Sequence, residues 1–465
     1  MAPDPRQGPD PRPGPTLGRG AGLAFRPPTV DRSFERRIVV VGILLTALYL
    51  VAALASTGLA PADRRGVWLP LHLALAGGAS TAIAAVMPFF VAAFAAVPPA
   101  DGRLRSAAVA LVSVGALLVV VGMTGDTAIL AAAGGVAYVV GIALTGLAVV
   151  RPVGGSLGPS RGLVTRAYVV ALVNVGVGVS LATLLLAGWA PVAGAWLTAK
   201  PTHAWLNAIG FVSLVVATTL LHFFPTVVGA RISAKRSARG VVVGIGAGAP
   251  LAAAGTLVGI GWLAAVGALA VLVGAISLAA MARHTWRTRG GWTTDLPWHR
   301  FAQGGLASGI GWFIVAAAIM AWRTVDAALS GAGLVGGQAA APTAAAQLAS
   351  AWSTSWVAAP LVAGWLGITF LASATHLLPA VGPGSPIAHA RQRRILGWGT
   401  APRLLALDAG CLLLALGLPL GLDGLARLGA ALLAVGAGAT TLLLVAAVAA
   451  GAPGGTAAGG QPARR

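Results

Sequence analysis

The chain has 465 residues, of which 57% are hydrophobic and 9% are charged, and its mean hydropathy is +0.86. Its apolar runs repeatedly exceed the ~18 residues that suggest a membrane span, which excludes an ordinary soluble protein. The formal net charge of +20 would suggest a nucleic-acid partner in a soluble domain. Here the basic residues lie almost wholly between the apolar runs, so we expect no nucleic-acid partner. The single cysteine, Cys411, excludes an intramolecular disulfide and a cysteine-based zinc cluster.

The apolar runs predict an all-α polytopic membrane protein with twelve transmembrane helices. Residues 1–36 are rich in Pro, Gly and Arg and are expected to form a disordered cytoplasmic tail. Residues 37–452 form the membrane domain, residues 453–465 a flexible cytoplasmic tail, and residues 326–350 a long outer loop without assigned chemistry. The predicted spans are 38–60, 67–96, 106–124, 127–150, 164–189, 203–229, 240–259, 261–282, 302–322, 352–380, 402–421 and 424–450.

The distribution of basic residues predicts the orientation of the chain. An even number of spans places both termini on the same side of the membrane. If that side is the cytoplasm, 26 Lys and Arg residues lie inside and 5 outside, as the positive-inside rule requires. The Arg64-Arg65 pair, on the outer side, is most at odds with this orientation.

The seven histidines fall into two groups. Three are expected to be solvated in inner loops: His284, His299 and His389. The other four lie within spans two, six and ten, which all run from outside to inside: His72, His203, His222 and His376. The helical rise puts His203 and His222 roughly 28 Å apart, so no single metal ion can contact both. The topology instead pairs His72 with His203 near the outer side and His222 with His376 near the inner side.

A weak internal repeat suggests that these three spans are neighbours. His222-Phe-Phe-Pro225-Thr-Val-Val-Gly229 matches His376-Leu-Leu-Pro379-Ala-Val-Gly382 with one residue deleted, and each histidine follows a glycine by twelve residues, at Gly210 and Gly364. Four spans separate the copies, so both copies have the same orientation. Span two offers a degenerate third copy, with His72, the small residues 76–79 and Pro88-Phe-Phe.

Twelve spans, a four-span period and histidines in spans two, six and ten resemble subunit I of the heme-copper oxidases. Locally, His203-Ala-Trp-Leu-Asn207-Ala-Ile-Gly210 and Leu221-His222-Phe-Phe-Pro225 are similar to the membrane region of copper-oxidase or nitrite-reductase-like proteins of high-GC bacteria. The resemblance implies three four-helix arcs, heme or copper held by intramembrane histidines, a cupredoxin or cytochrome as redox partner, and a bacterial plasma membrane as location.

Departures from that family argue against a complete oxygen reductase. Span seven lacks the expected histidine pair, span ten has His376 in place of His-x-His, and Asn207 stands where many of these enzymes have tyrosine. Asp408 is the only acidic residue within a predicted span, which leaves no set of carboxylates for proton channels.

Two classes of function remain open. In the first, His72, His203, His222 and His376 bind heme or copper in a redox or gas-response role, because a bis-histidine heme needs one histidine from each of two facing helices. Asn207 would then hydrogen-bond the ligand or a partner helix, and Asp408 would form an ion pair with Arg403 or handle protons. In the second, the histidines are neutral hydrogen-bonding residues in a transporter or a non-catalytic structural membrane protein without a metal cofactor.

Overall fold

The computed structural model describes residues 32–60, 62–63, 65–95, 97–152, 162–231, 235–290, 296–331, 344–381 and 385–451. These residues are helical and contain no β-strand. Twelve helices are long and apolar enough to cross a membrane, which confirms the number of spans. The predicted tails up to residue 31 and from residue 452 lie outside the described residues, as does the middle of the outer loop, residues 332–343.

Nine of the twelve spans are single helices in the described chain. They are α1 (Arg32–Ser56), α4 (Gly102–Thr124), α5 (Ala128–Val150), α6 (Gly162–Leu186), α10 (Lys235–Val258), α11 (Gly261–Arg287), α12 (Pro297–Gly331), α17 (Thr400–Leu420) and α18 (Asp423–Gly451). Two shorter helices, α7 (Ala190–Ala193) and α16 (Pro386–Leu396), lie between spans, and a third, α13 (Ala344–Ala351), forms the outer start of span ten.

Spans two, six and ten differ from the others because a π-helical segment divides each of them. Span two consists of α2 (Trp68–His72), η1 (Leu73–Ala79) and α3 (Ser80–Ala95). Span six consists of α8 (Trp196–Ala204), η3 (Trp205–Ser213) and α9 (Leu214–Val228), and span ten of α14 (Thr354–Val357), η5 (Ala358–Ile368) and α15 (Thr369–Val381). These are the three spans that carry the intramembrane histidines at the predicted positions.

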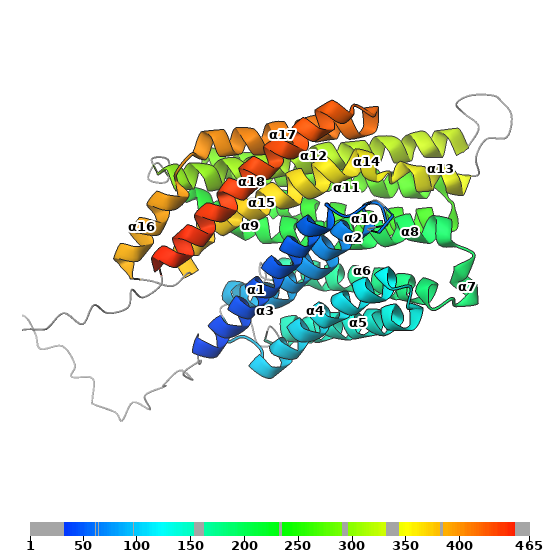
Figure 1. Cartoon of the computed structure of the whole chain (residues 1–465), viewed down its shortest axis with the longest axis horizontal. Coiled ribbons are helices and arrows are strands. Elements are labelled where there is room, and N and C mark those ends of the chain that lie inside the picture. The colour runs from blue at the N-terminus through cyan, green and yellow to red at the C-terminus, as the bar shows by residue number, and fades with distance from the viewer. Residues whose placement is uncertain are drawn as a thin grey trace, which may run out of the picture.

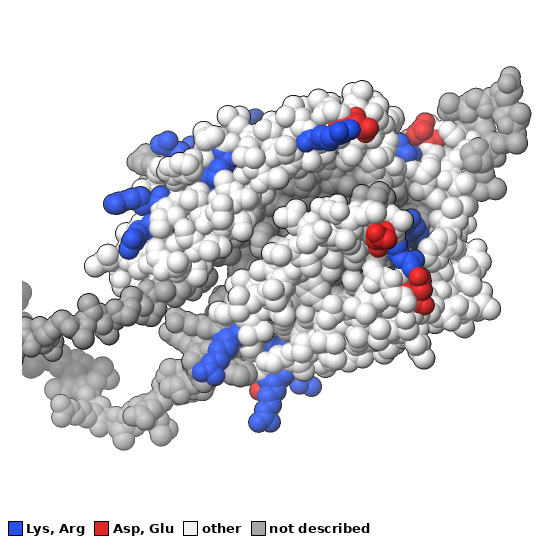
Figure 2. Space-filling view, viewed as in Figure 1, with Lys and Arg blue, Asp and Glu red and all other residues white. Residues whose placement is uncertain are grey.

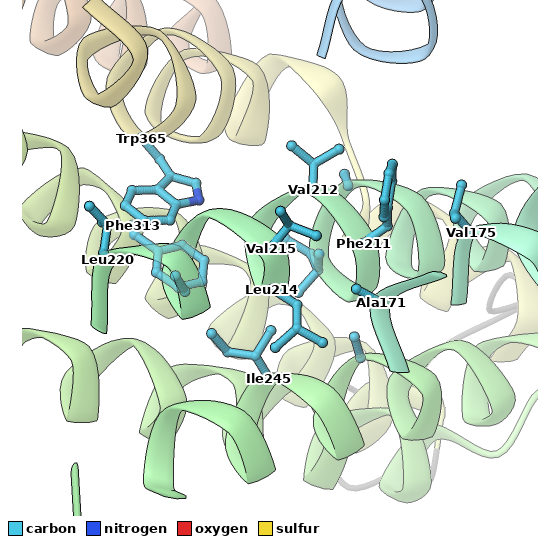
Figure 3. Close-up of a cluster of buried hydrophobic side chains, with 14 of the residues drawn as sticks. Ala171, Val175, Phe211, Val212, Leu214, Val215, Leu220, Ile245, Phe313 and Trp365 are labelled. Carbon is cyan, nitrogen blue, oxygen red and sulfur yellow. The ribbon is translucent and has the colours of Figure 1, made fainter. Parts of the chain in front are cut away.

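Span six lies at the centre of the bundle. Its most apolar 18-residue stretch is 78% buried, the highest value of the twelve spans. Figure 3 shows Phe211 and Leu214 of this span packed among residues of four neighbours, namely Val175 (α6), Ile245 (α10), Phe313 (α12) and Trp365 (η5). In Figure 1 the long helices lie side by side, and the start of α1 and the end of α18 are at the same end of the bundle.

Close packing between successive spans depends on glycine. A Cβ atom at Gly134 of α5 would lie 2.6 Å from the backbone nitrogen of Val119 in α4, and one at Gly115 of α4 would lie 2.6 Å from the nitrogen of Tyr138. The two backbones therefore touch, and small residues allow the van der Waals contact that holds membrane helices together. Gly410 and Gly429 make the equivalent approach between α17 and α18.

The charged residues of the described chain gather at the ends of the bundle. Figure 2 shows most of the blue side chains at the end where α16 lies, and most of the red ones toward the opposite end. Residues 385–398, predicted as part of an inner loop, include helix α16, whose Arg391, Arg393 and Arg394 are exposed. At the other end, Arg65 forms an ion pair with Asp126 in the turn between α4 and α5, which neutralises the basic residue that fits the orientation rule least well.

The glycine contacts predict the effect of adding one methyl group. Gly134→Ala is expected to lower the unfolding free energy by about 1–3 kcal/mol, because its Cβ would overlap the α4 backbone. Gly146→Ala is the control on the same helix, since its Cβ would meet only Leu172 Cδ1 at 3.8 Å, an ordinary contact. Thermal unfolding of the purified protein in detergent measures both. Equal midpoints for the two variants would contradict the packing.

Candidate functional site

The π-helical segments of spans two, six and ten end in the same way. Each ends at or just before a buried hydroxyl residue, which is Ser80, Ser213 or Thr369. Ser80 Oγ donates to Leu75 O at 2.9 Å, and Ser213 Oγ donates to Ala208 O at 2.8 Å. Both bonds reach five residues back, the spacing of the π-helix itself. The hydroxyl therefore supports the wider turn in spans two and six.

In each π segment, a side chain of the preceding span lies where one glycine would have a Cβ atom. The pairs are Tyr49 with Gly77, Asn174 with Gly210, and Trp312 with Gly364. A Cβ on these glycines would lie 2.2 Å, 2.7 Å and 2.5 Å from the side chain that fills the space. The same contact thus joins spans one and two, five and six, and nine and ten, which supports the three-copy repeat. It also shows that these glycines make room for neighbouring side chains.

His72 and His203 come together as the topology predicted. Their ring centroids are 6.2 Å apart and their planes differ by 9°. Trp68 stacks on His72 with a centroid distance of 4.1 Å. His203 does not open its span, because helix α8 begins at Trp196, seven residues earlier. Both histidines therefore lie inside their spans. His72 directly precedes η1, and one residue, Ala204, separates His203 from η3.

The two imidazoles are oriented by backbone carbonyls. His72 Nδ1 lies 2.9 Å from Trp68 O, and His203 Nδ1 lies 2.9 Å from Gly178 O of α6. A proton on each Nδ1 donates these bonds, so the lone pair of each ring is on Nε2. A proline precedes each histidine by two residues, at Pro70 and Pro201. This shared Pro-x-His spacing is a further sequence signal of the repeat between spans two and six.

Asn207 contacts the His203 ring, as its position in the sequence suggested. Its Nδ2 lies 2.8 Å from His203 Nδ1 and 3.1 Å from Nε2. Its Oδ1 is buried and has no hydrogen-bond partner within the described residues. Asn174 makes a polar contact between helices, since its Nδ2 donates to Gly210 O at 2.9 Å.

In the described chain, the two histidines of the predicted inner pair, His222 and His376, stack on different aromatic rings. His222 stacks on Phe94 of α3 at 4.7 Å, whereas His376 stacks on Trp298 and His299 of α12, each at 5.4 Å. The Nδ1 atoms of His222 and His376 are buried without a hydrogen-bond partner in the described chain. These two rings fill aromatic stacks, and no carbonyl orients them toward a shared ligand.

The prediction that His299 is a solvated loop residue is wrong. It is only 6% exposed, and Trp298 stacks on it with a centroid distance of 3.9 Å. The physical reason is the helix boundary: α12 begins at Pro297, five residues before the predicted start of the span. Proline suits the first turn of a helix, so Pro297 was an available signal for the earlier start. His284, by contrast, is exposed as expected.

Asp408 does not form the predicted ion pair with Arg403. The Arg403 guanidinium donates to Leu396 O at 2.6 Å and lies over the ring of Phe301. Asp408 Oδ1 instead accepts hydrogen bonds from Ser308 Oγ and from Trp312 Nε1, the latter at 3.0 Å. Arg65–Asp126 is the one ion pair within the described residues.

The donor set limits which metals this region could hold. Within the part of the chain that the structure describes, no group of three or more His, Cys, Asp or Glu side chains could hold a metal ion. A metal near the outer pair would therefore have two imidazole ligands from the protein. Zinc or calcium sites normally need three or more protein ligands, which makes both a poor fit here.

Comparisons with known proteins identify the fold. No protein-family description and no curated protein matches the chain in sequence. A chain in a cryo-EM structure of a heme-copper terminal oxidase dimer has a similar fold, with a TM-score of 0.64 and 14% sequence identity over 90% of this chain and 84% of that chain. The chain has a fold like that of heme-copper oxidase subunit I. The predicted fold is confirmed, while the low identity leaves the chemistry to this chain's own residues.

Two glycines on α6 provide a test of the His203 environment. A Cβ at Gly178 would lie 2.6 Å from Asn207 Oδ1, whereas one at Gly176 would meet no described atom within 4 Å. Gly178→Ala should therefore lower the unfolding free energy by about 1–3 kcal/mol, and Gly176→Ala should raise it by up to about 1 kcal/mol.

The contact with Asn207 is isolated by a double mutant. Adding Asn207→Ala to Gly178→Ala should recover part of the loss, because it removes the amide that the methyl group displaces. Thermal unfolding gives all four values. Strict additivity of the two substitutions would contradict the contact.

Proposed function

We propose that this protein is a membrane redox or gas-response protein that binds one heme iron or one copper ion between His72 and His203. The observation that carries the proposal is the orientation of the two rings, which are nearly parallel and each bonded through Nδ1 to a backbone carbonyl. Metal-binding histidines are held in this way, because the carbonyl fixes the ring and leaves Nε2 for the metal.

The spacing of the rings limits the geometry of ligation. A metal–imidazole bond is about 2.0 Å long and the nitrogen is about 1 Å from its ring centroid, so two ligands on one metal have centroids at most about 6 Å apart. The observed 6.2 Å is close to that limit, so His72 and His203 could hold one metal between them with little movement. Imidazole binds both iron and copper, and either would supply redox chemistry or binding of a small gas molecule there.

This chain's own residues would have three tasks at such a site. Trp68 O and Gly178 O hold the two rings. Trp68 covers one side of His72 with its indole and keeps water from that side. Asn207, whose amide is already at the His203 ring, would hydrogen-bond a diatomic ligand or the ring edge. A bound heme iron or copper would supply one-electron transfer or binding of a small gas molecule.

The proposal does not extend to a complete oxygen reductase. Helix α10, in the position of span seven, has no histidine, and Asn207 replaces the tyrosine expected after the span-six histidine. We propose a cupredoxin or cytochrome as the redox partner, in a bacterial plasma membrane with both termini in the cytoplasm. The excess of basic residues at one end of the bundle supports that orientation.

The alternative is a transporter or a structural membrane protein of the same fold without a metal cofactor. The position of Asn207 Nδ2, 3.1 Å from His203 Nε2, favours this alternative, because the amide can donate to the lone pair that a metal would use. The two proposals differ in whether Asn207 moves away from Nε2 when a ligand is supplied.

Absorption spectroscopy and metal analysis test the proposal. Protein purified from cells supplied with heme and copper is expected to show a Soret band, or one bound copper per chain. His72→Ala and His203→Ala should each remove that signal. His222→Ala is the control, since His222 lies in a separate aromatic stack, and it should keep the signal.

Two results would overturn the metal site. One is a folded wild-type protein that remains colourless and metal-free after reconstitution with both hemin and cuprous ion. The other is a signal that persists in the His72→Ala and His203→Ala variants. Retention of the Soret band with loss of copper, or the reverse, would identify which group binds.

A further inference from the structure

Asp408 is a half-buried carboxyl group in the middle part of a membrane-spanning helix. It is the ninth residue of α17, which begins at Thr400, so the helical rise puts it about 12 Å from the start of the helix. The other acidic residues of the described chain lie in turns or near helix ends: Glu35, Asp63, Asp101, Asp126, Asp326 and Asp423. An ionisable side chain at such a depth is costly unless it is paired or has a function.

Two neutral donors from α12 hold this carboxyl group. Ser308 Oγ and Trp312 Nε1 both donate to Asp408 Oδ1, and no cation lies within ion-pair distance in the described chain. Both donors are uncharged, so a carboxylate at this position would have hydrogen bonds but no compensating cation in the described chain.

The repeat shows that a carboxyl group is not needed for the structural contact. In the first copy, Tyr49 takes the place of Trp312. Its hydroxyl donates to the backbone oxygen of Ser113 at 2.6 Å. In the second copy, Asn174 donates to Gly210 O. Both acceptors are uncharged carbonyls, and the same close contact with a π-segment glycine is formed. In the third copy the acceptor is Asp408, which can gain or lose a proton. The packing of the helices does not require an acceptor of this kind.

Few titratable groups surround Asp408. Helix α12 has no charged or titratable residue between Arg300 and Arg323, α14 and η5 have none, and α18 has none between Arg427 and Gly451. On α17 itself, Arg403 is bonded to Leu396 O. Cys411, three residues after Asp408, donates its thiol to Ala359 O of η5 at 3.3 Å.

We propose that Asp408 is a proton-binding site within the membrane, and that its protonation state alters the contact between α12 and the π segment of span ten. The proton adds to a carboxylate oxygen and converts a charge of −1 to zero, with no electron transfer. Trp312 Nε1 then donates to a neutral acid, which is a weaker acceptor than the carboxylate. Because the Trp312 ring fills the space at Gly364, the change reaches η5 directly.

Infrared difference spectroscopy of the full-length protein in lipid nanodiscs tests this proposal. Spectra recorded in pH steps between about pH 4 and about pH 10 should contain a carboxylic C=O band that appears as the pH falls. Subtraction of the Asp408→Asn spectra isolates the contribution of this residue. The test does not depend on a cofactor, so it is independent of the proposed metal site.

Variants of the two donors identify the site. Ser308→Ala and Trp312→Phe each remove a bond to the carboxylate, so the midpoint of the band should move upward by roughly one to two pH units. Gly311→Ala is the matched control, because its Cβ would meet no described atom within 4 Å and its midpoint should not move.

Two outcomes would overturn the proposal. One is the absence of any band in the wild-type protein that the Asp408→Asn variant lacks. The other is an Asp408 band whose midpoint is the same in wild type, Ser308→Ala and Trp312→Phe. If Asp408→Asn fails to fold, the shift in the two donor variants relative to Gly311→Ala still decides the question.

Discussion

The contact between a side chain and a π-segment glycine determines the geometry of the three histidine-bearing spans. In each copy, a residue of the preceding span lies where a Cβ would be, as Tyr49 does at Gly77. A π-helical segment changes the direction in which the following residues face, and such segments often mark functional sites. In span two a histidine lies one residue before the π segment, and in span six a histidine lies two residues before it. In span ten these two places are occupied by Val357 and Trp356, so the third copy keeps the architecture without the histidine.

The outer and inner histidines differ in how they are held, which separates a candidate ligand site from packing. His72 and His203 each bond a carbonyl through Nδ1 and face each other at 6.2 Å. His222 and His376 stack on aromatic rings and leave Nδ1 without a partner in the described chain. A ligand site needs side chains held in place before the ligand arrives, since fixing them afterwards costs conformational entropy. Only the outer pair meets that condition.

The sequence predicted the parts of the structure that depend on hydropathy and on whether a span is even- or odd-numbered, which sets its direction across the membrane. Twelve spans follow from apolar runs, and the meeting of His72 and His203 follows from the shared direction of spans two and six. The glycine partners could not be predicted, because Ala, Gly and Leu repeat throughout the chain and many registers look alike. The environment of His299 depended on a five-residue shift of one helix start, and the partners of Asp408 lie about a hundred positions away in sequence.

The two proposed sites are connected by a continuous series of contacts. Trp312 is bonded to Asp408 and packs on Gly364, and the next residue, Trp365, donates its Nε1 to Ser213 Oγ at 3.2 Å. Ser213 is the last residue of η3, the segment that contains Asn207. A structural change at Asp408 can therefore be transmitted to the His203 ring by contacts within the protein, first through η5 and then through η3. Coupling between sites requires an element with two arrangements. Each site contacts a π segment, η5 for Asp408 through Trp312 and η3 for His203 through Asn207, and the bond between Trp365 and Ser213 joins the two segments.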